Sequence, residues 1–149
     1  MRILLAIALI ASTGLPALAY RLPPTTDKVT QDECGACHMV YPAGLLPARS
    51  WDAITSDLAH HFGEDASLSP DVTAGIKGYL MAHAGDSGPK IFKFARGVPA
   101  DQTPLKVTDL PLWHRIHGDF SVRVMKKIGA VGNCSFCHKG AANGEFYED

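Results

Sequence analysis

Two stretches in the first half of the chain carry apolar side chains that recur every three or four residues, as on one face of a helix. The apolar positions are Trp51, Ile54 and Leu58 in the first stretch and Val72, Ile76, Tyr79 and Leu80 in the second. The first predicts a helix from 51 to about 62, with Ser50 as its N-cap. The second predicts a helix from 70 to about 84, with Ser69 as its N-cap and a proline at N1.

Elsewhere the pattern is weaker and predicts only short elements. Thr30 and Glu33 match a capping box, which predicts a short helix carrying residues 34–38. A further short helix is expected over 109–118, and residues 121–128 fit either a strand or a helix. Asn133 can cap a last helix. No stretch alternates as a half-buried strand does, so we expect a mainly α fold.

Residues 85–104 contain Gly and Pro breaks without a sustained period and predict a connection between two halves, 20–88 and 89–149. The connection contains Lys90, Lys93 and Arg96. These side chains belong either to a solvated loop or to a patch that docks a partner.

The first nineteen residues have the pattern of a secretory signal peptide. Arg2 is followed by the apolar run 3–11, and Ala17-Leu18-Ala19 matches a cleavage site. We expect cleavage after Ala19 and a periplasmic protein; the alternative is an uncleaved anchor. No second apolar stretch approaches the length that spans a bilayer.

Charge narrows the set of partners. The 149 residues contain 14 Lys and Arg and 15 Asp and Glu, a formal net charge of -1. Nothing in this balance favours nucleic acid or an anionic membrane. A mildly acidic protein of this kind would favour a partner with a basic docking face.

All four cysteines of the chain lie in two Cys-x-x-Cys-His motifs. The motifs are Cys34-Gly35-Ala36-Cys37-His38 and Cys134-Ser135-Phe136-Cys137-His138. This pattern is typical of c-type haem attachment, in which both thiols bond the haem and the histidine is the proximal iron ligand. Two disulfides or a zinc ribbon are the alternatives, but each pair is followed by a histidine and the pairs are far apart for a ribbon. We therefore predict two covalently bound haem c groups.

The second axial ligands are less certain from the sequence. For the first haem, His61 continues the apolar stripe of the helix predicted over 51–62, His60 lies on another face, and His83 continues the next stripe. For the second haem, helical phase does not separate His114 from His117. The thioether alternatives are Met81 and Met125.

Beyond these motifs, the chain resembles the bacterial dihaem cytochromes c that partner the sphaeroides-type haem protein. The resemblance covers nearly all of the sequence after the signal segment and is most specific in GLLPARSW, residues 44–51, and HFGEDASL, residues 61–68. It implies two low-spin haems, each bound by two histidines: His38 with His61, and His138 with His117. It also implies a monohaem, oxygen-binding cytochrome as redox partner.

Together these features predict a small, loop-rich c-type cytochrome with short helices packed around two haems. We expect an electron carrier and no enzyme activity. The alternatives are a small dihaem redox enzyme of peroxidase type and a haem subunit of a larger electron-transfer complex. Because haem would supply much of the apolar core, the haem-free chain should fold poorly.

Overall fold

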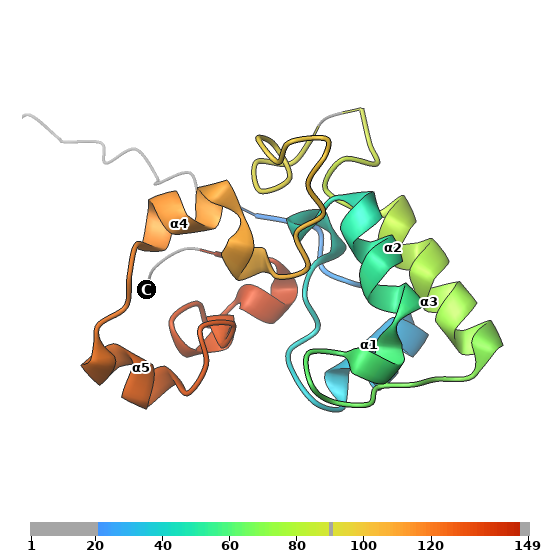
Figure 1. Cartoon of the computed structure of the whole chain (residues 1–149), viewed down its shortest axis with the longest axis horizontal. Helices are drawn as coiled ribbons and strands as arrows, with labels where there is room; N and C mark the ends of the chain where they lie inside the picture. The colour runs from blue at the N-terminus through green and yellow to red at the C-terminus, as the bar shows by residue number, and fades with distance from the viewer. Residues whose placement is uncertain (1–20, 90, 147–149) are drawn as a thin grey trace, which may run out of the picture.

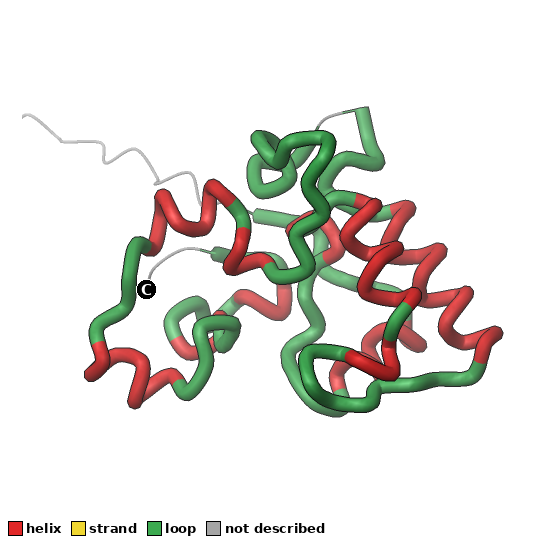
Figure 2. Tube along the Cα trace, viewed as in Figure 1, coloured by secondary structure: helices red, strands yellow, loops and turns green. Residues whose placement is uncertain are grey.

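The computed structural model describes residues 21–89 and 91–146, and within them the fold is mainly α, as the sequence predicts (Figures 1 and 2). The α-helices are α1 (Lys28–Gly35), α2 (Ala48–Ser56), α3 (Pro70–Ala82), α4 (Pro111–His117) and α5 (Val122–Ile128). Three single 3-10 turns lie between the helices, and two follow α5: η1 (Ala43–Leu45), η2 (Leu58–His60), η3 (Val107–Asp109), η4 (Cys134–Phe136) and η5 (Ala141–Asn143). The described residues form isolated bridges but no strand.

The predicted signal segment, residues 1–19, and Lys90 lie outside the described residues. No described helix combines the length and apolar character needed to cross a membrane.

Helix α1 begins earlier than the capping box predicted. Its N-cap is Asp27, whose carboxylate accepts from the backbone N–H of Thr30 at 2.8 Å and from its hydroxyl at 2.7 Å. Thr30 is therefore a buried residue inside the helix, and the prediction that it caps the helix is wrong. Aspartate is as good a cap as threonine, and here it gains two hydrogen bonds from one residue.

Helix α2 also differs from its predicted bounds at both ends. It begins at Ala48, whose backbone N–H donates to the Asp86 carboxylate at 2.7 Å, so a partner distant in sequence replaces the predicted local cap. Ser50 is buried within the helix. The helix ends at Ser56 instead of about 62, and η2 carries the chain onward.

Helix α3 follows the prediction, with Ser69 at the N-cap and Pro70 in the first turn, although the Ser69 side chain makes no capping hydrogen bond. It packs against α2, and the two lie side by side in Figure 1.

In the second half, α4 matches its predicted range and ends at Gly118, which has a φ of 60°. The ambiguous residues 121–128 form α5, with the Ser121 hydroxyl accepting from the Val124 N–H at 3.4 Å. The last predicted helix is only the 3-10 turn η4. Asn133 lies at its N-cap, but its side chain instead donates to the Ile128 carbonyl at 2.9 Å.

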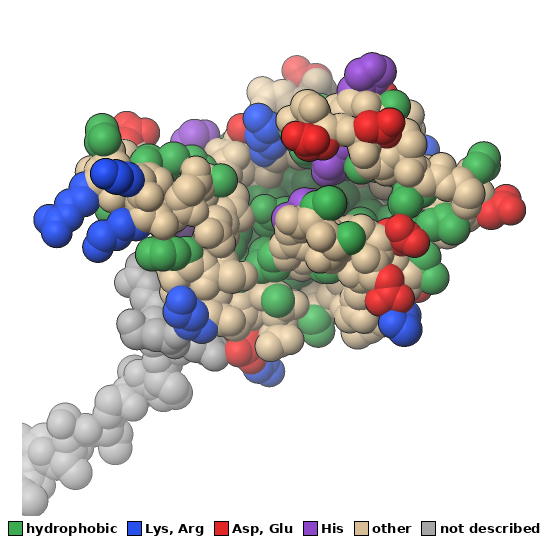
Figure 3. Space-filling model, turned by 90° about the horizontal axis from the view of Figure 1, so that it is seen from below, with side chains coloured by type: hydrophobic (Ala, Val, Ile, Leu, Met, Phe, Trp, Pro, Cys, Tyr) green, Lys and Arg blue, Asp and Glu red, His purple; other side chains and the backbone are tan. Residues whose placement is uncertain are grey.

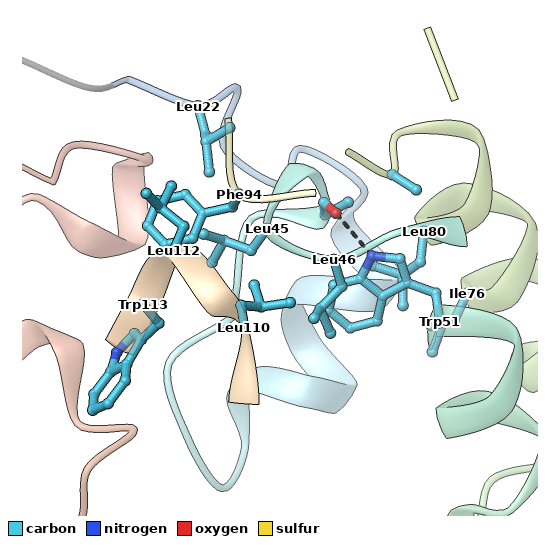
Figure 4. Packing of buried hydrophobic residues seen from close by; sticks show 12 residues of the cluster. Leu22, Leu45, Leu46, Trp51, Ile76, Leu80, Phe94, Leu110, Leu112 and Trp113 are labelled. Carbon is cyan, nitrogen blue, oxygen red and sulfur yellow. Dashed lines mark hydrogen bonds between the residues drawn. The ribbon is translucent and has the colours of Figure 1, made fainter. Parts of the chain in front are cut away.

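The buried core takes residues from both halves of the chain (Figure 4). Trp51 donates its indole N–H to the Ala43 carbonyl at 2.8 Å within this core. Gly85 allows the close approach of the connecting loop, because a Cβ there would lie 2.5 Å from the Ala95 Cβ and 2.6 Å from the Gly44 carbonyl oxygen. The largest members of the core are Leu22, Leu45, Leu46, Trp51, Ile76, Leu80, Phe94, Leu110, Leu112 and Trp113.

Candidate haem-binding sites

The four motif cysteines are free thiols in the structure. Cys34 and Cys134 are half-buried, whereas Cys37 and Cys137 are exposed. Burial raises the pKa of both the Cys34 and the Cys134 thiol. The described residues contain no group of three or more His, Cys, Asp or Glu side chains placed to hold one metal ion. Each motif thus presents its own pair of thiols, one partly buried and one open to solvent.

At the first motif, His38 faces His61. Their ring centroids are 6.2 Å apart and their planes differ by 18°. His61 follows η2 and is held by a tight turn: it pairs with Glu64, and the next two residues, Phe62 and Gly63, have φ of 54° and 102°. Burial lowers the pKa of His61, and the nearby His38 lowers it further.

The alternatives for the first site point elsewhere. His60 is largely exposed, and its Nδ1 lies 2.7 Å from the Asp57 carboxylate. His83 is exposed, with its ring stacked 4.3 Å from that of Tyr79. Met81 packs against the buried core. Among the candidates for the first site, His61 is therefore the one whose ring the structure places opposite that of His38.

At the second motif, His138 faces His117. The ring centroids are 6.0 Å apart, but here the planes are nearly perpendicular, at 84°. His117 is the last residue of α4, and its ring stacks on Trp113 at 4.8 Å and 20°. His114 is exposed and meets the edge of the same indole. Helical phase did not separate the two histidines, because the side of α4 that faces the motif depends on tertiary packing.

Backbone hydrogen bonds orient the rings of His38 and His117. The Nδ1 of His38 lies 2.7 Å from the Met39 carbonyl oxygen, and that of His117 lies 3.2 Å from the Trp113 carbonyl oxygen. A carbonyl can only accept, so Nδ1 is the donor in each bond and Nε2 is the nitrogen left to face a metal ion. Metal-bound histidines are commonly oriented by this kind of hydrogen bond.

The separations of the two ring pairs fit a single metal ion between each pair. An imidazole nitrogen binds a transition metal at about 2 Å, so two opposed imidazoles place their ring centroids roughly 6 Å apart. Both observed values match this geometry. The residues therefore fit two c-type haems, with a pair of thiols and a pair of imidazoles available to each.

Apolar side chains surround the candidate sites. A cavity of about 360 Å³ beside α4 has a mixed lining: the apolar residues are Trp113, Phe120, Met125 and Val131, and the polar ones include Thr108, Asp109, His114 and Asp119. Phe62, next to His61, and Phe136, inside the second motif, are exposed aromatic side chains. Figure 3 shows a hollow with hydrophobic and histidine side chains at its walls. Such walls suit a large apolar macrocycle.

The loops of the two motifs touch, a contact that no local sequence pattern indicates. The Tyr41 hydroxyl donates to the Gly132 carbonyl at 2.8 Å, and the Ser135 hydroxyl lies 3.1 Å from the Met39 sulfur. The Tyr41 ring also lies 5.3 Å from that of His38. Tyr41 thus joins the two candidate sites; its only sequence signal is its position three residues after the motif.

Comparisons with known proteins agree with this arrangement. The family described as dihaem cytochrome c matches residues 30–146. A diheme cytochrome c from Rhodobacter sphaeroides is 46% identical, with a TM-score of 0.78 over 83% of this chain and 99% of that one. A second structure from that organism is 44% identical, with a TM-score of 0.69 over the same shares.

A diheme cytochrome type c from Shewanella baltica OS155 is 38% identical, with a TM-score of 0.63 over 80% of this chain and 86% of that one. No curated protein matches the chain. The family match spans both motifs and both histidine pairs, and the fold agrees with the solved structures. The chain therefore belongs to the dihaem cytochrome c family and is a haem electron-transfer protein.

Proposed function

We propose that this protein is an exported, periplasmic electron carrier whose two covalently bound haem c groups each have two histidine ligands. His38 and His61 would bind the first iron, and His138 and His117 the second. The observation that carries the proposal is the pair of ring separations, 6.2 Å and 6.0 Å, each matching two imidazoles on one metal. Cys34, Cys37, Cys134 and Cys137 would hold the haems covalently.

The protein's contribution to the chemistry is to keep both axial positions filled. The bound haems supply one-electron redox chemistry at iron, whose potential depends on the axial ligands. Two histidines favour lower potentials than a His/Met pair, because an axial methionine raises the potential. If two histidines, held in place by packing and hydrogen bonds, bound each iron, substrates would have no open coordination position. This is the arrangement of a carrier.

Contact between the two motif loops supports electron transfer within the protein. The Tyr41–Gly132 hydrogen bond and the Ser135–Met39 contact link the residues that follow one motif to residues within or beside the other. An electron could then enter at one haem and leave at the other. The external partner would be a monohaem, oxygen-binding cytochrome of the sphaeroides haem protein type, bound through the small, transient contact that redox pairs use.

Carbon monoxide tests the closed coordination directly. We expect the dithionite-reduced holoprotein to keep its visible spectrum when carbon monoxide is added, because neither iron has a free position. Binding of one carbon monoxide per protein would contradict bis-histidine ligation at one haem. Sustained peroxide turnover with a reduced donor would instead favour an enzyme.

A further inference from the structure

Charged side chains are divided unequally between the two halves of the molecule. Residues 21–89 carry four Lys or Arg against nine Asp or Glu, whereas residues 91–146 carry eight against four. The net charge of -1 thus conceals an acidic half with the first motif and a basic half with the second. Haem propionates would add the same charge to each half and leave this difference unchanged.

The basic side chains of the two halves also differ in their pairing. All four in residues 21–89 form ion pairs: Arg21 with Glu145, Lys28 with Asp32, Arg49 with Asp86 and Lys77 with Asp52. In the second half, seven exposed basic side chains have no carboxylate within ion-pair distance among the described residues, and five of them lie in residues 115–139. We call these five the basic end: Arg115, Arg123, Lys126, Lys127 and Lys139.

Three of the five belong to α5, where positions 123, 126 and 127 share one face. In Figure 3, Lys and Arg side chains gather at the end of the molecule where Figure 1 places α5, while acidic side chains are spread over the opposite end. Unpaired like charges on one face create a positive potential that compact ion pairs elsewhere do not cancel.

The basic end lies beside the second motif. The Asn133 side chain donates to the Ile128 carbonyl at 2.9 Å, which ties the end of α5 to the residue before Cys134. Within the motif loop, the Lys139 ammonium donates to the Phe136 carbonyl at 3.0 Å and lies 5.7 Å from its ring centroid. Phe136 is 43% exposed, and Val122, at the start of α5, is 87% exposed. Exposed aromatic and apolar side chains suit the core of a protein interface, and charged side chains around them suit its polar rim.

We propose that the basic end is the docking face for an acidic redox protein, which exchanges electrons with the protein at the second haem. The inference rests on the electron-carrier function proposed above, since that function requires a redox partner and a lipid surface is not one. Whole-chain charge favours a basic partner, but charges more than about 8 Å apart are largely screened at physiological salt, so the local field decides. Complementary charge would steer the encounter and raise its rate.

The test uses the holoprotein and flavodoxin hydroquinone, an acidic one-electron donor, in stopped-flow mixing at about 10 mM and about 500 mM salt. The variant K126Q/K127Q removes two positive charges from the basic end. The control K28E makes the same change in net charge on α1, in the other half. Far-UV circular dichroism and the ferric spectrum check that both variants are folded.

We expect the wild-type rate constant to fall with salt. At low salt the rate constant of K126Q/K127Q should be lower than that of the wild type by about three- to tenfold, and that of K28E should equal the wild-type value. The rate constants of all three proteins should converge at high salt.

Equal slowing of both variants, or no slowing of either, would overturn the docking face while leaving electron transfer intact. Loss of binding to phosphatidylserine vesicles in K126Q/K127Q, with an unchanged flavodoxin rate, would assign the face to a membrane and also overturn it. A wild-type protein that accepts no electrons at either salt concentration contradicts the carrier function itself.

Discussion

Each motif histidine faces one other imidazole at a distance that leaves room for one metal ion between them. The two ring pairs differ in the angle between their planes. The planes of His38 and His61 differ by 18°, and those of His117 and His138 by 84°. If both imidazoles of a pair bound one iron, nearly parallel ring planes would separate the energies of the two iron orbitals that overlap with the imidazole π systems. Perpendicular planes would keep these two orbitals close in energy. Two haems with the same ligands should therefore be spectroscopically distinct.

Replacing His61 should open the first iron alone. In H61A the imidazole opposite His38 is gone, so the reduced protein should bind one carbon monoxide, measured as a shifted Soret band in the difference spectrum. H60A is the matched control, because His60 is directed to Asp57 at 2.7 Å and should leave the spectrum unchanged. Carbon monoxide binding by H60A and none by H61A would exchange the roles of the two residues.

The sequence could predict the residues of the sites better than their geometry. The motif spacing alone indicates four thiols and two histidines. The sequence favours His61 because it continues a helical stripe, but the helix ends at Ser56, and the turn at Phe62 and Gly63 is what holds His61. The pairing of the rings as iron ligands remains a prediction.

Helix ends depend on side chains that local patterns do not reveal. Helix α2 begins where Asp86, from the loop after α3, accepts its backbone N–H, so a cap based on neighbouring residues could not be found there. By contrast, α4 begins with Pro111 and ends at a glycine with positive φ, both local signals, and its range was predicted. Residues 121–128 had no clear period; a local cap, Ser121, accompanies their helical form.

The N-cap of α1 should make stability depend on pH in a specific direction. Hydrogen bonds from Thr30 lower the pKa of Asp27 below its ordinary value of 3.8. Its contribution is therefore fully present above pH 4 and is lost as the pH falls through the lowered folded-state pKa. D27A should melt a few degrees below the wild type at pH 7, measured by circular dichroism, and the difference should shrink toward pH 2.

D27N separates the cap from its charge, because asparagine also caps helices but does not titrate. It should melt above D27A, with a difference from D27A that does not vary with pH. A pH-independent difference between the wild type and D27A would contradict the titration of Asp27 as its cause.

Over the whole molecule, two halves with opposite charge share one hydrophobic core and one junction between the motif loops. Core residues come from both sides of the connection, from Leu45 and Trp51 to Leu110 and Trp113. The sequence predicted the mainly α class and the loop-rich character. It could not predict the junction, since contacts such as Tyr41 with Gly132 join residues 91 positions apart and leave no local pattern.

Removing the hydroxyl of Tyr41 should weaken that junction. Y41F loses the hydrogen bond to the Gly132 carbonyl and leaves this acceptor without its partner in a half-buried place. We expect the free energy of unfolding to fall by about 1 kcal/mol, measured by denaturant titration of the holoprotein. The ferric spectrum should not change, because Tyr41 is not among the proposed iron ligands. An unchanged unfolding midpoint would mean that the contact contributes nothing to stability.

The central claim, two closed bis-histidine haems, is tested most directly by low-temperature electron paramagnetic resonance of the ferric holoprotein. We predict two low-spin signals of equal intensity. One should be rhombic with three resolved features, from the nearly parallel rings of His38 and His61, and the other should be dominated by a single feature at high g, from the nearly perpendicular rings of His117 and His138. A stoichiometric high-spin signal from either iron would contradict the account.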